Sequence, residues 1–151
     1  MKANHLLSIL LSALLFSCGL SNDQQLEEKL RQEITSGKKT IEFEKLTNFE
    51  WENLLILGPY SQIKNIEKEL DVDLCEIEHF NVQTRDDVNL IVFMVGRQPV
   101  NVIVYPHYPG DFSGNASKLI PKSDANFEVV VVADKKTKNG EQWIDMKLNT
   151  L

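Results

Sequence analysis

The sequence predicts an α+β domain: a largely antiparallel sheet of about five or six strands, one helix between the early strands and another helix at the N-terminal side. Late segments rich in β-branched residues stop at turn residues, which is typical of strands. Short connections join two pairs of these segments, and such connections favour antiparallel pairing. Two other segments repeat apolar residues at helical spacing.

The N-terminus reads as an export signal. The apolar run Leu6–Phe16 is far shorter than the ~20 residues that span a bilayer, so it predicts the apolar part of a secretory signal. The tetrapeptide LFSC, Leu15 to Cys18, resembles the lipobox of bacterial lipoproteins. The resemblance implies removal of residues 1–17, acylation of Cys18 by chains such as palmitate, and anchoring in a lipid bilayer of the cell envelope. An ordinary signal with an incidental cysteine is the alternative.

The residue after the cysteine indicates the membrane to which such a lipoprotein is sorted. Gly19 stands where an aspartate would mark retention, so in a cell with two membranes the resemblance implies the outer membrane.

Charge and length limit what the exported part can be. The chain has 16 basic and 22 acidic residues, and loss of Lys2 with the signal leaves a formal charge of −7. This balance argues against nucleic acid as a partner, because that affinity comes mostly from lysine and arginine. The remaining 134 residues suit one domain. Only Cys75 is then left besides Cys18, so no internal disulfide is expected, and burial of Cys75 is the favoured interpretation over an intermolecular or reactive thiol.

Residues 18–38 are expected to form an anchor-proximal helix or spacer. Apolar residues recur every fourth position, at Leu26, Leu30 and Ile34. Ser21 or Asp23 can cap the start, and Gly37 can end the helix. The helix either packs on the domain or separates it from the membrane, and both alternatives stay open.

Residues 39–151 are expected to form a single α+β domain. The stretch TIEFEKL, Thr40 to Leu46, predicts a half-buried strand, and Trp51–Leu57 predicts a second one that stops at Gly58 and Pro59. A helix follows, with Ser61 as its cap and apolar residues at Ile63, Ile66 and Leu70. The segment Asp71–Val88 suggests a helix end and a short strand.

Four stronger strands follow: Asn89–Gly96, Val100–Tyr105, Phe127–Asp134 and Gln142–Leu148. The connections GRQP and KKTKNG predict two hairpins. The runs IVFMV and VVVV are apolar at consecutive positions, so we expect both faces of those strands to be covered. In the last strand Trp143 falls on the polar face, where it is either covered by the N-terminal helix or a loop, or exposed as a contact residue.

Several of these features together resemble a group of small, uncharacterised exported bacterial proteins. They are Trp51 followed by the Gly58, Pro59, Tyr60 turn, the apolar strand around Phe93, and a proline-containing loop that ends in Asp111 and Phe112. The resemblance implies a fold, but no reaction or ligand.

The loop YPHYPGDFSG, Tyr105 to Gly114, is the first candidate for a binding surface, because rigid loops with aromatic and polar groups commonly carry recognition. The candidate binding residues are Tyr105, His107, Tyr108, Asp111, Phe112 and Trp143. The leading hypothesis is a non-enzymatic lipoprotein domain that binds a protein partner.

Two alternatives stay open: an inhibitor or immunity-type protein against a basic hydrolase or toxin, and a hydrolase that uses His107 and Asp111. Catalysis is not expected, because no nucleophile elbow accompanies these residues. The stretch CEIEH, Cys75 to His79, does not predict a metal site, because a strand would place the two glutamates on the opposite face from Cys75 and His79. No cofactor is expected.

Overall fold

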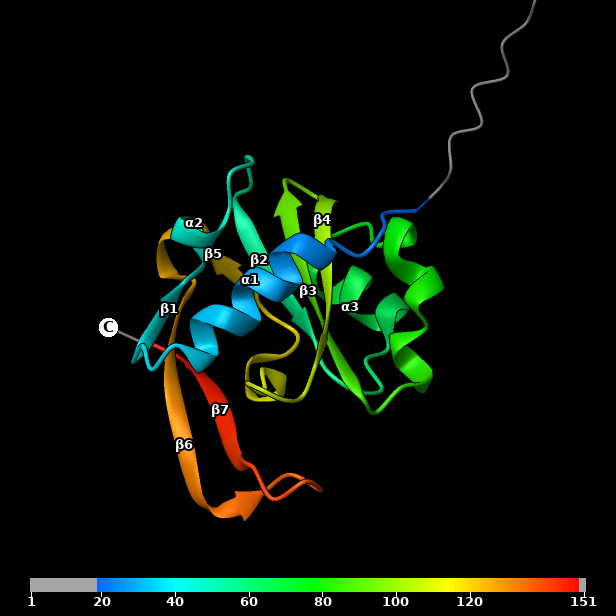
Figure 1. Ribbon diagram of the computed structural model, residues 1–151. Coiled ribbons are helices and arrows are strands. Elements are labelled where there is room, and N and C mark those ends of the chain that lie inside the picture. Colours follow the sequence, from blue (N-terminus) through cyan, green and yellow to red (C-terminus); the bar gives the residue numbers. More distant parts are fainter. Residues whose placement is uncertain (1–18, 150–151) are drawn as a thin grey trace, which may run out of the picture.

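The computed structural model describes residues 19–149, which form an α+β fold with two antiparallel sheets, as predicted (Figure 1). The larger sheet has the order β4-β3-β2-β5 and consists of β2 (Asn53–Leu57), β3 (Val88–Val95), β4 (Gln98–Pro106) and β5 (Leu119–Pro121). The smaller sheet has the order β1-β6-β7 and consists of β1 (Thr40–Glu42), β6 (Asn126–Lys136) and β7 (Gln142–Leu148). The two predicted hairpins, β3–β4 and β6–β7, are confirmed.

Helices complete the described chain. The α-helices are α1 (Gln24–Thr35), α2 (Phe43–Leu46) and α3 (Ile63–Leu70). Short 3₁₀-helices occur at η1 (Cys75–Phe80), η2 (Val82–Thr84), η3 (Ser113–Asn115) and η4 (Lys122–Asp124). No helix of the described part is long and apolar enough to cross a membrane.

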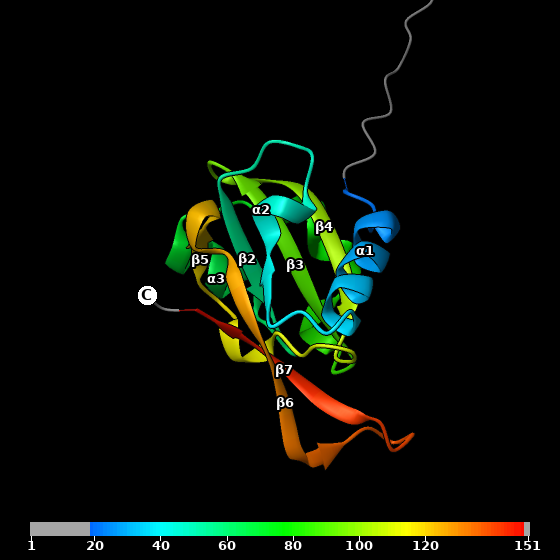
Figure 2. The same ribbon diagram turned by 60° about the vertical axis from the view of Figure 1, so that its left-hand side comes forward.

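The larger sheet is covered on both faces, as the apolar run in β3 predicts. Ile91 and Phe93 point into a core shared with α1, α2 and the smaller sheet, whereas Leu90 and Val92 point into a second core under α3 and η1. The view in Figure 2 shows α1 and α2 in front of the sheet and α3 behind it. Because side chains alternate along a strand, a strand buried on both sides reads as a continuous apolar run.

The N-terminal helix packs on the domain, which settles the alternative that its pattern leaves open. Asp23 caps α1 by accepting a hydrogen bond from the backbone N–H of Leu26. The apolar stripe is buried in the first core: Leu26, Leu30 and Ile34. Residues assigned to a spacer therefore contribute to the same core as the sheet.

Two segments differ from their predicted structure. Only the first part of TIEFEKL is a strand, because a single helical turn from Phe43 to Leu46 follows and directs both of these side chains into the core. The segment Asp71–Val88 contains the 3₁₀-helices η1 and η2 and no strand before β3 begins at Val88. The buried residues Val72, Leu74 and Ile77 are two and then three positions apart, a spacing that suits irregular turns better than a strand.

The turn before α3 also differs. Ser61 does not cap the helix, since Gln62 takes that position without a side-chain hydrogen bond. Tyr60 adopts a φ of 59° and leaves 56% of its surface exposed.

The distal part of the smaller sheet is a two-stranded ribbon formed by β6 and β7, and it projects from the body (Figures 1 and 2). The pairing of β1 with β6 ends at Thr40 and Glu128, whereas β6 continues to Lys136. The expectation that both faces of the VVVV run are covered is wrong here, because Val131 is 60% exposed. The ribbon extends past the body that would cover it.

Candidate functional site

The residues of the predicted loop divide between the core and a polar cluster. Tyr105 and Phe112 are fully buried and pack edge to face, with ring centroids 5.7 Å apart. Phe112 also packs against Phe43 and Phe127. The expectation that Tyr105 and Phe112 form a contact surface is therefore corrected: their rings hold the core together and reach no partner.

His107, Asp111 and Ser113 meet at one carboxylate oxygen. Oδ1 of Asp111 lies 2.9 Å from Nδ1 of His107, 2.6 Å from Oγ of Ser113 and 2.9 Å from the backbone nitrogen of Ser113. Because an ionised carboxylate only accepts hydrogen bonds, the imidazole and the hydroxyl are the donors. Asn89, fully buried in β3, adds its side-chain amide at 3.4 Å.

These contacts stabilise the ionised form of Asp111. Burial raises the pKa of the carboxyl, but the hydrogen bonds from Ser113 and His107 outweigh burial and hold this pKa below its ordinary value of 3.8. The side chains of His107 and Asp111 are each 17% exposed, so solvent screens the contact only partly.

The cluster does not have the geometry of a serine–histidine–aspartate relay. In such a relay the serine and the carboxylate occupy opposite nitrogens of the imidazole. Here Ser113 and Asp111 both lie at Nδ1 of His107, at 3.3 and 2.9 Å. Nε2 of His107 is buried and has no hydrogen-bond partner in the described part of the chain. The arrangement fixes a loop and provides no base for the Ser113 hydroxyl other than a weakly basic carboxylate.

The loop joins the two sheets. The backbone N–H of Asp111 donates to the carbonyl of Ile144, and the N–H of Met146 donates to the carbonyl of Asp111. Asn115 continues this pattern with its side chain, donating to the carbonyl of Met146 and accepting from the N–H of Leu148. The loop thus pairs with the free edge of β7 as a short strand would.

The close approach of the loop to α1 and β7 requires a glycine. Gly110 has a φ of +96°, and a Cβ there would lie 2.8 Å from Cδ1 of Ile34 and 3.2 Å from Cγ of Met146. A φ in this region is strained for any residue with a side chain, and the 2.8 Å contact would in addition force Ile34 to shift. Gly110 therefore fixes the loop against both elements.

Asn89 and Asn115 belong to the site but are not among the residues predicted from the sequence. Asn89 stands at the start of an apolar strand, and a polar residue fully buried in such a run needs a hydrogen-bonded neighbour, which is a usable signal for a polar cluster. Asn115 follows the loop in a stretch rich in small residues and carries no comparable signal. Its role depends on the position of β7, which local sequence does not specify.

Tyr108 is the aromatic loop residue that stays near the surface. Its side chain is half-buried, and its carbonyl accepts a hydrogen bond from Arg31 at 3.4 Å. The Arg31 guanidinium lies 5.8 Å from the centre of the Tyr105 ring. The contact of Arg31 therefore ties the loop to α1.

Trp143 lies on the polar face of the ribbon, as predicted, and is half-buried. Its indole N–H donates to Asp145 at 2.8 Å, and the ammonium of Lys135 lies 3.7 Å from the ring centre. A cation this close to an indole face is attracted by its π electrons. Asp145 and Lys135 thus belong to the same hairpin as Trp143, and the side chain of Trp143 remains at the surface.

A surface cavity of about 360 Å³ lies between the loop and β7. Its lining includes Asp111 and Asp145 as well as Lys118 and Lys147. Asp111 therefore connects the buried polar cluster with the surface.

The segment Cys75–His79 is part of η1, so the prediction of a strand with two separate faces is wrong. The favoured burial of Cys75 is also wrong, since this residue is exposed. Within residues 19–149, no three histidine, cysteine, aspartate or glutamate side chains form a group that could hold a metal ion. Cys18, the predicted lipidation site, lies outside the described residues.

No family model, no curated protein and no solved structure matches this chain.

Proposed function

We propose that this chain is a lipid-anchored, non-enzymatic binding domain of a bacterial cell envelope, and that it contacts a protein partner through the β6–β7 ribbon. The observation that carries the proposal is the LFSC tetrapeptide placed directly before a folded domain. The first described residues already belong to that domain, because the N–H of Leu20 donates to the carbonyl of Glu76. An acyl group on Cys18 would hold the domain close to the bilayer.

The shape of the domain supports the ribbon as the contact surface. The chain enters the domain at Gly19, and the ribbon projects at the opposite end of the molecule (Figures 1 and 2). Anchoring beside Gly19 would therefore direct the ribbon away from the membrane. Val131, 60% exposed, provides apolar surface on one face there, the half-buried Trp143 lies on the other face, and exposed apolar surface commonly marks an interaction site.

The polar cluster supports binding rather than hydrolysis. The Asp111 oxygen that meets Nδ1 of His107 also accepts two hydrogen bonds from Ser113, so the carboxylate, the Ser113 hydroxyl and Nδ1 of His107 are paired with one another. Groups that satisfy one another stiffen a loop more readily than they activate a nucleophile.

Two measurements on the full-length chain in its native envelope test this proposal. The wild-type chain should partition into the detergent phase and incorporate a labelled fatty acid, whereas Cys18→Ser should do neither. Equal partitioning of the two would contradict the anchor.

A photo-crosslinker placed at Val131 should give one discrete protein adduct. A crosslinker at Lys45, which is exposed on the body, serves as the matched control. The same adducts from both positions would contradict binding through the ribbon.

A further inference from the structure

The outer edge of β6 is open along the ribbon. β6 runs from Asn126 to Lys136, but β1 pairs with it only as far as Glu128. One further bond follows, from the N–H of Val129 to the carbonyl of Lys39, at 2.8 Å. Beyond Val129, no strand among residues 19–149 pairs with this edge. The pairing of β6 with β7 is regular only as far as Val132 and shifts register before Lys136, and the carbonyl of Ala133 accepts from Gln142, so Val131 carries the open backbone groups.

The direction of the backbone groups follows from the ladder. The N–H of Val129 points toward β1, and backbone groups of alternate residues in an antiparallel strand point to the same side. The N–H and carbonyl of Val131 therefore point away from β7 into the open edge. An unpaired edge of this kind is a template for an added strand.

The side chains along the open edge are apolar as far as Ala133, and the exposed Asp134 and Lys135 follow before Lys136. Val131 is 60% exposed, and it follows Phe127 and Val129 on the face of β6 that begins in the core. A strand laid against this edge would place its own side chains beside Val131 and extend that apolar face.

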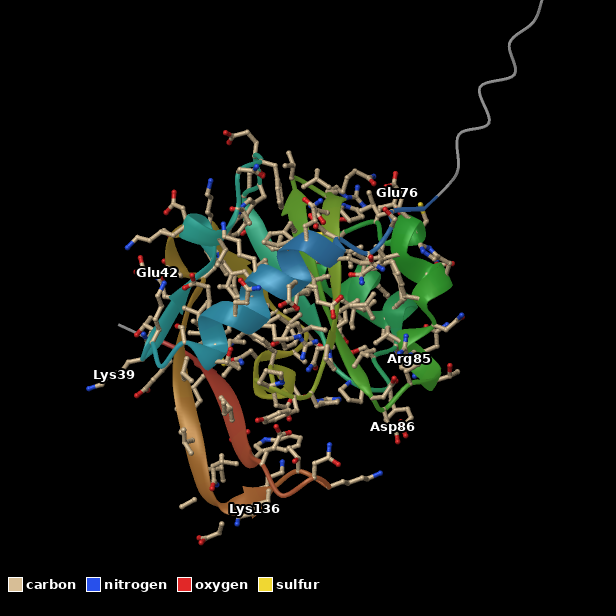
Figure 3. All side chains as sticks on the ribbon, in the orientation of Figure 1. Lys39, Glu42, Glu76, Arg85, Asp86 and Lys136 are labelled. Atoms are coloured by element: carbon tan, nitrogen blue, oxygen red, sulfur yellow. The ribbon has the colours of Figure 1, made fainter. Side chains whose placement is uncertain are left out.

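Lysines stand at both ends of the open segment. Lys39 lies opposite Val129, and Lys136 ends β6. Figure 3 labels both lysines. Neither lysine makes an ion pair within the described part of the chain, although the protein is acidic overall. The open edge is therefore an apolar segment from Val129 to Ala133, with Lys39 at one end and Asp134, Lys135 and Lys136, whose formal charges sum to +1, at the other.

A second copy of the chain does not fit this edge. Antiparallel pairing of two β6 strands about Val131 would place Ala133 of one copy opposite Val129 of the other. In each copy the backbone of Lys39 already occupies that position beside Val129. Such pairing would also bring the lysines of both copies together, whereas a free segment that pairs from Val130 onward meets neither obstacle.

We propose that β6 binds an extended segment of a protein partner as an added strand, and that this segment is apolar in its centre and acidic at both ends. The proposal rests on the proposed partner-binding function. The backbone of Val131 would provide hydrogen bonds, and Lys39 and Lys136 would pair with the acidic ends.

The first test uses a fluorescent, end-blocked heptapeptide of alternating threonine and valine with glutamate at both ends. Its twin carries lysine at both ends. Fluorescence anisotropy with the full-length chain in detergent micelles should show at least ~10-fold tighter binding of the glutamate peptide, and added salt should weaken it. Equal binding of the two peptides, or binding of neither, would overturn the proposal.

Variants locate the site. Val131→Pro removes the N–H at the open edge and should abolish binding, whereas Val131→Thr keeps the N–H and should bind within ~3-fold of the wild type. The double variant Lys39→Glu, Lys136→Glu should instead prefer the lysine peptide. The double variant keeps the test decisive if Val131→Pro disturbs the ribbon; retained preference for the glutamate peptide in that variant would contradict the site.

Hydrogen exchange at single-residue resolution provides a second readout. The glutamate peptide should protect the amide of Val131 and leave that of Val130 unchanged, since the latter already faces β7. If a crosslinker at Val131 captures an envelope protein but the peptide does not bind, the result supports partner binding through the ribbon and contradicts strand addition to β6. A wild-type dimer in sedimentation that Val131→Pro dissociates would assign the edge to a second copy and overturn the proposal.

Discussion

At the scale of single residues, Asp111 shows how one carboxylate organises a loop. Its side chain collects hydrogen bonds from His107 and Ser113, and its backbone pairs with β7. Charge-assisted hydrogen bonds to a partly buried carboxylate are among the stronger polar contacts in a protein. The loop is therefore fixed by groups that sequence reasoning assigns to binding or catalysis.

The lowered pKa of Asp111 predicts a pH-dependent stability. A carboxyl whose pKa is lower in the folded than in the unfolded state stabilises the fold above its unfolded pKa, and this contribution is lost as the pH falls through the folded pKa. The free energy of unfolding should therefore decrease below pH ~4, where unfolded aspartate protonates. In urea titrations, the difference between wild type and Asp111→Asn should be largest near pH 6 and should shrink toward pH 3.

Asp86→Asn is the control for this prediction. Asp86 is exposed, and its side chain makes no hydrogen bond or ion pair with the described residues. The difference in the free energy of unfolding between Asp86→Asn and the wild type should therefore stay near zero at every pH. A difference for Asp111→Asn that is constant with pH would contradict the role of the ionised carboxylate.

At the scale of elements, α1 is part of the domain. Leu30 is fully buried in the first core, one turn after Leu26 and one turn before Ile34. A short amphipathic helix gains most of its stability from packing of this kind. Burial of the stripe therefore holds α1 on the domain.

Leu30→Ala should destabilise the domain by ~2–5 kcal/mol, because it removes buried methyl groups and leaves a cavity. Urea unfolding measured by circular dichroism checks this value. Gln25→Ala, at an exposed position of the same helix, should change the free energy of unfolding by less than ~0.5 kcal/mol. Equal, small effects of the two substitutions would indicate that α1 does not contribute to the core.

At the scale of the whole molecule, the two ends differ in how their strands are supported. The central strand β3 is flanked by β2 and β4 and is covered on both faces. Beyond Val129, β6 pairs with β7 alone among the described strands and has little cover. Local opening is expected where few buried apolar contacts hold the backbone.

Amide hydrogen exchange should show this difference. Amides of β3 should exchange only through global unfolding, whereas amides from Val131 to Trp143 should exchange through local opening of the ribbon. Low concentrations of urea should therefore accelerate exchange in β3 and leave the ribbon amides almost unchanged. Identical urea dependence in both regions would contradict independent opening of the ribbon.

Local patterns in the sequence determine much of the fold. Helical spacing at Leu26 and Leu30, the β-branched runs and the two short hairpin connections predict the main elements and their antiparallel pairing. The continuous apolar run of β3 also predicts its burial on both faces. These features follow from short-range periodicity, which packing of one core preserves.

The tertiary structure alone decides which predicted residues are available at the surface. Tyr105 and Phe112 belong to the core because the loop that carries them folds under β7, whereas the VVVV run, which reads like a buried strand, leaves the body. The sequence shows that side chains are apolar, and only the positions of distant elements show what covers them. Burial depends on contacts between residues that are distant in the sequence. For that reason the sequence indicates the loop as the candidate binding surface, whereas the structure indicates the ribbon.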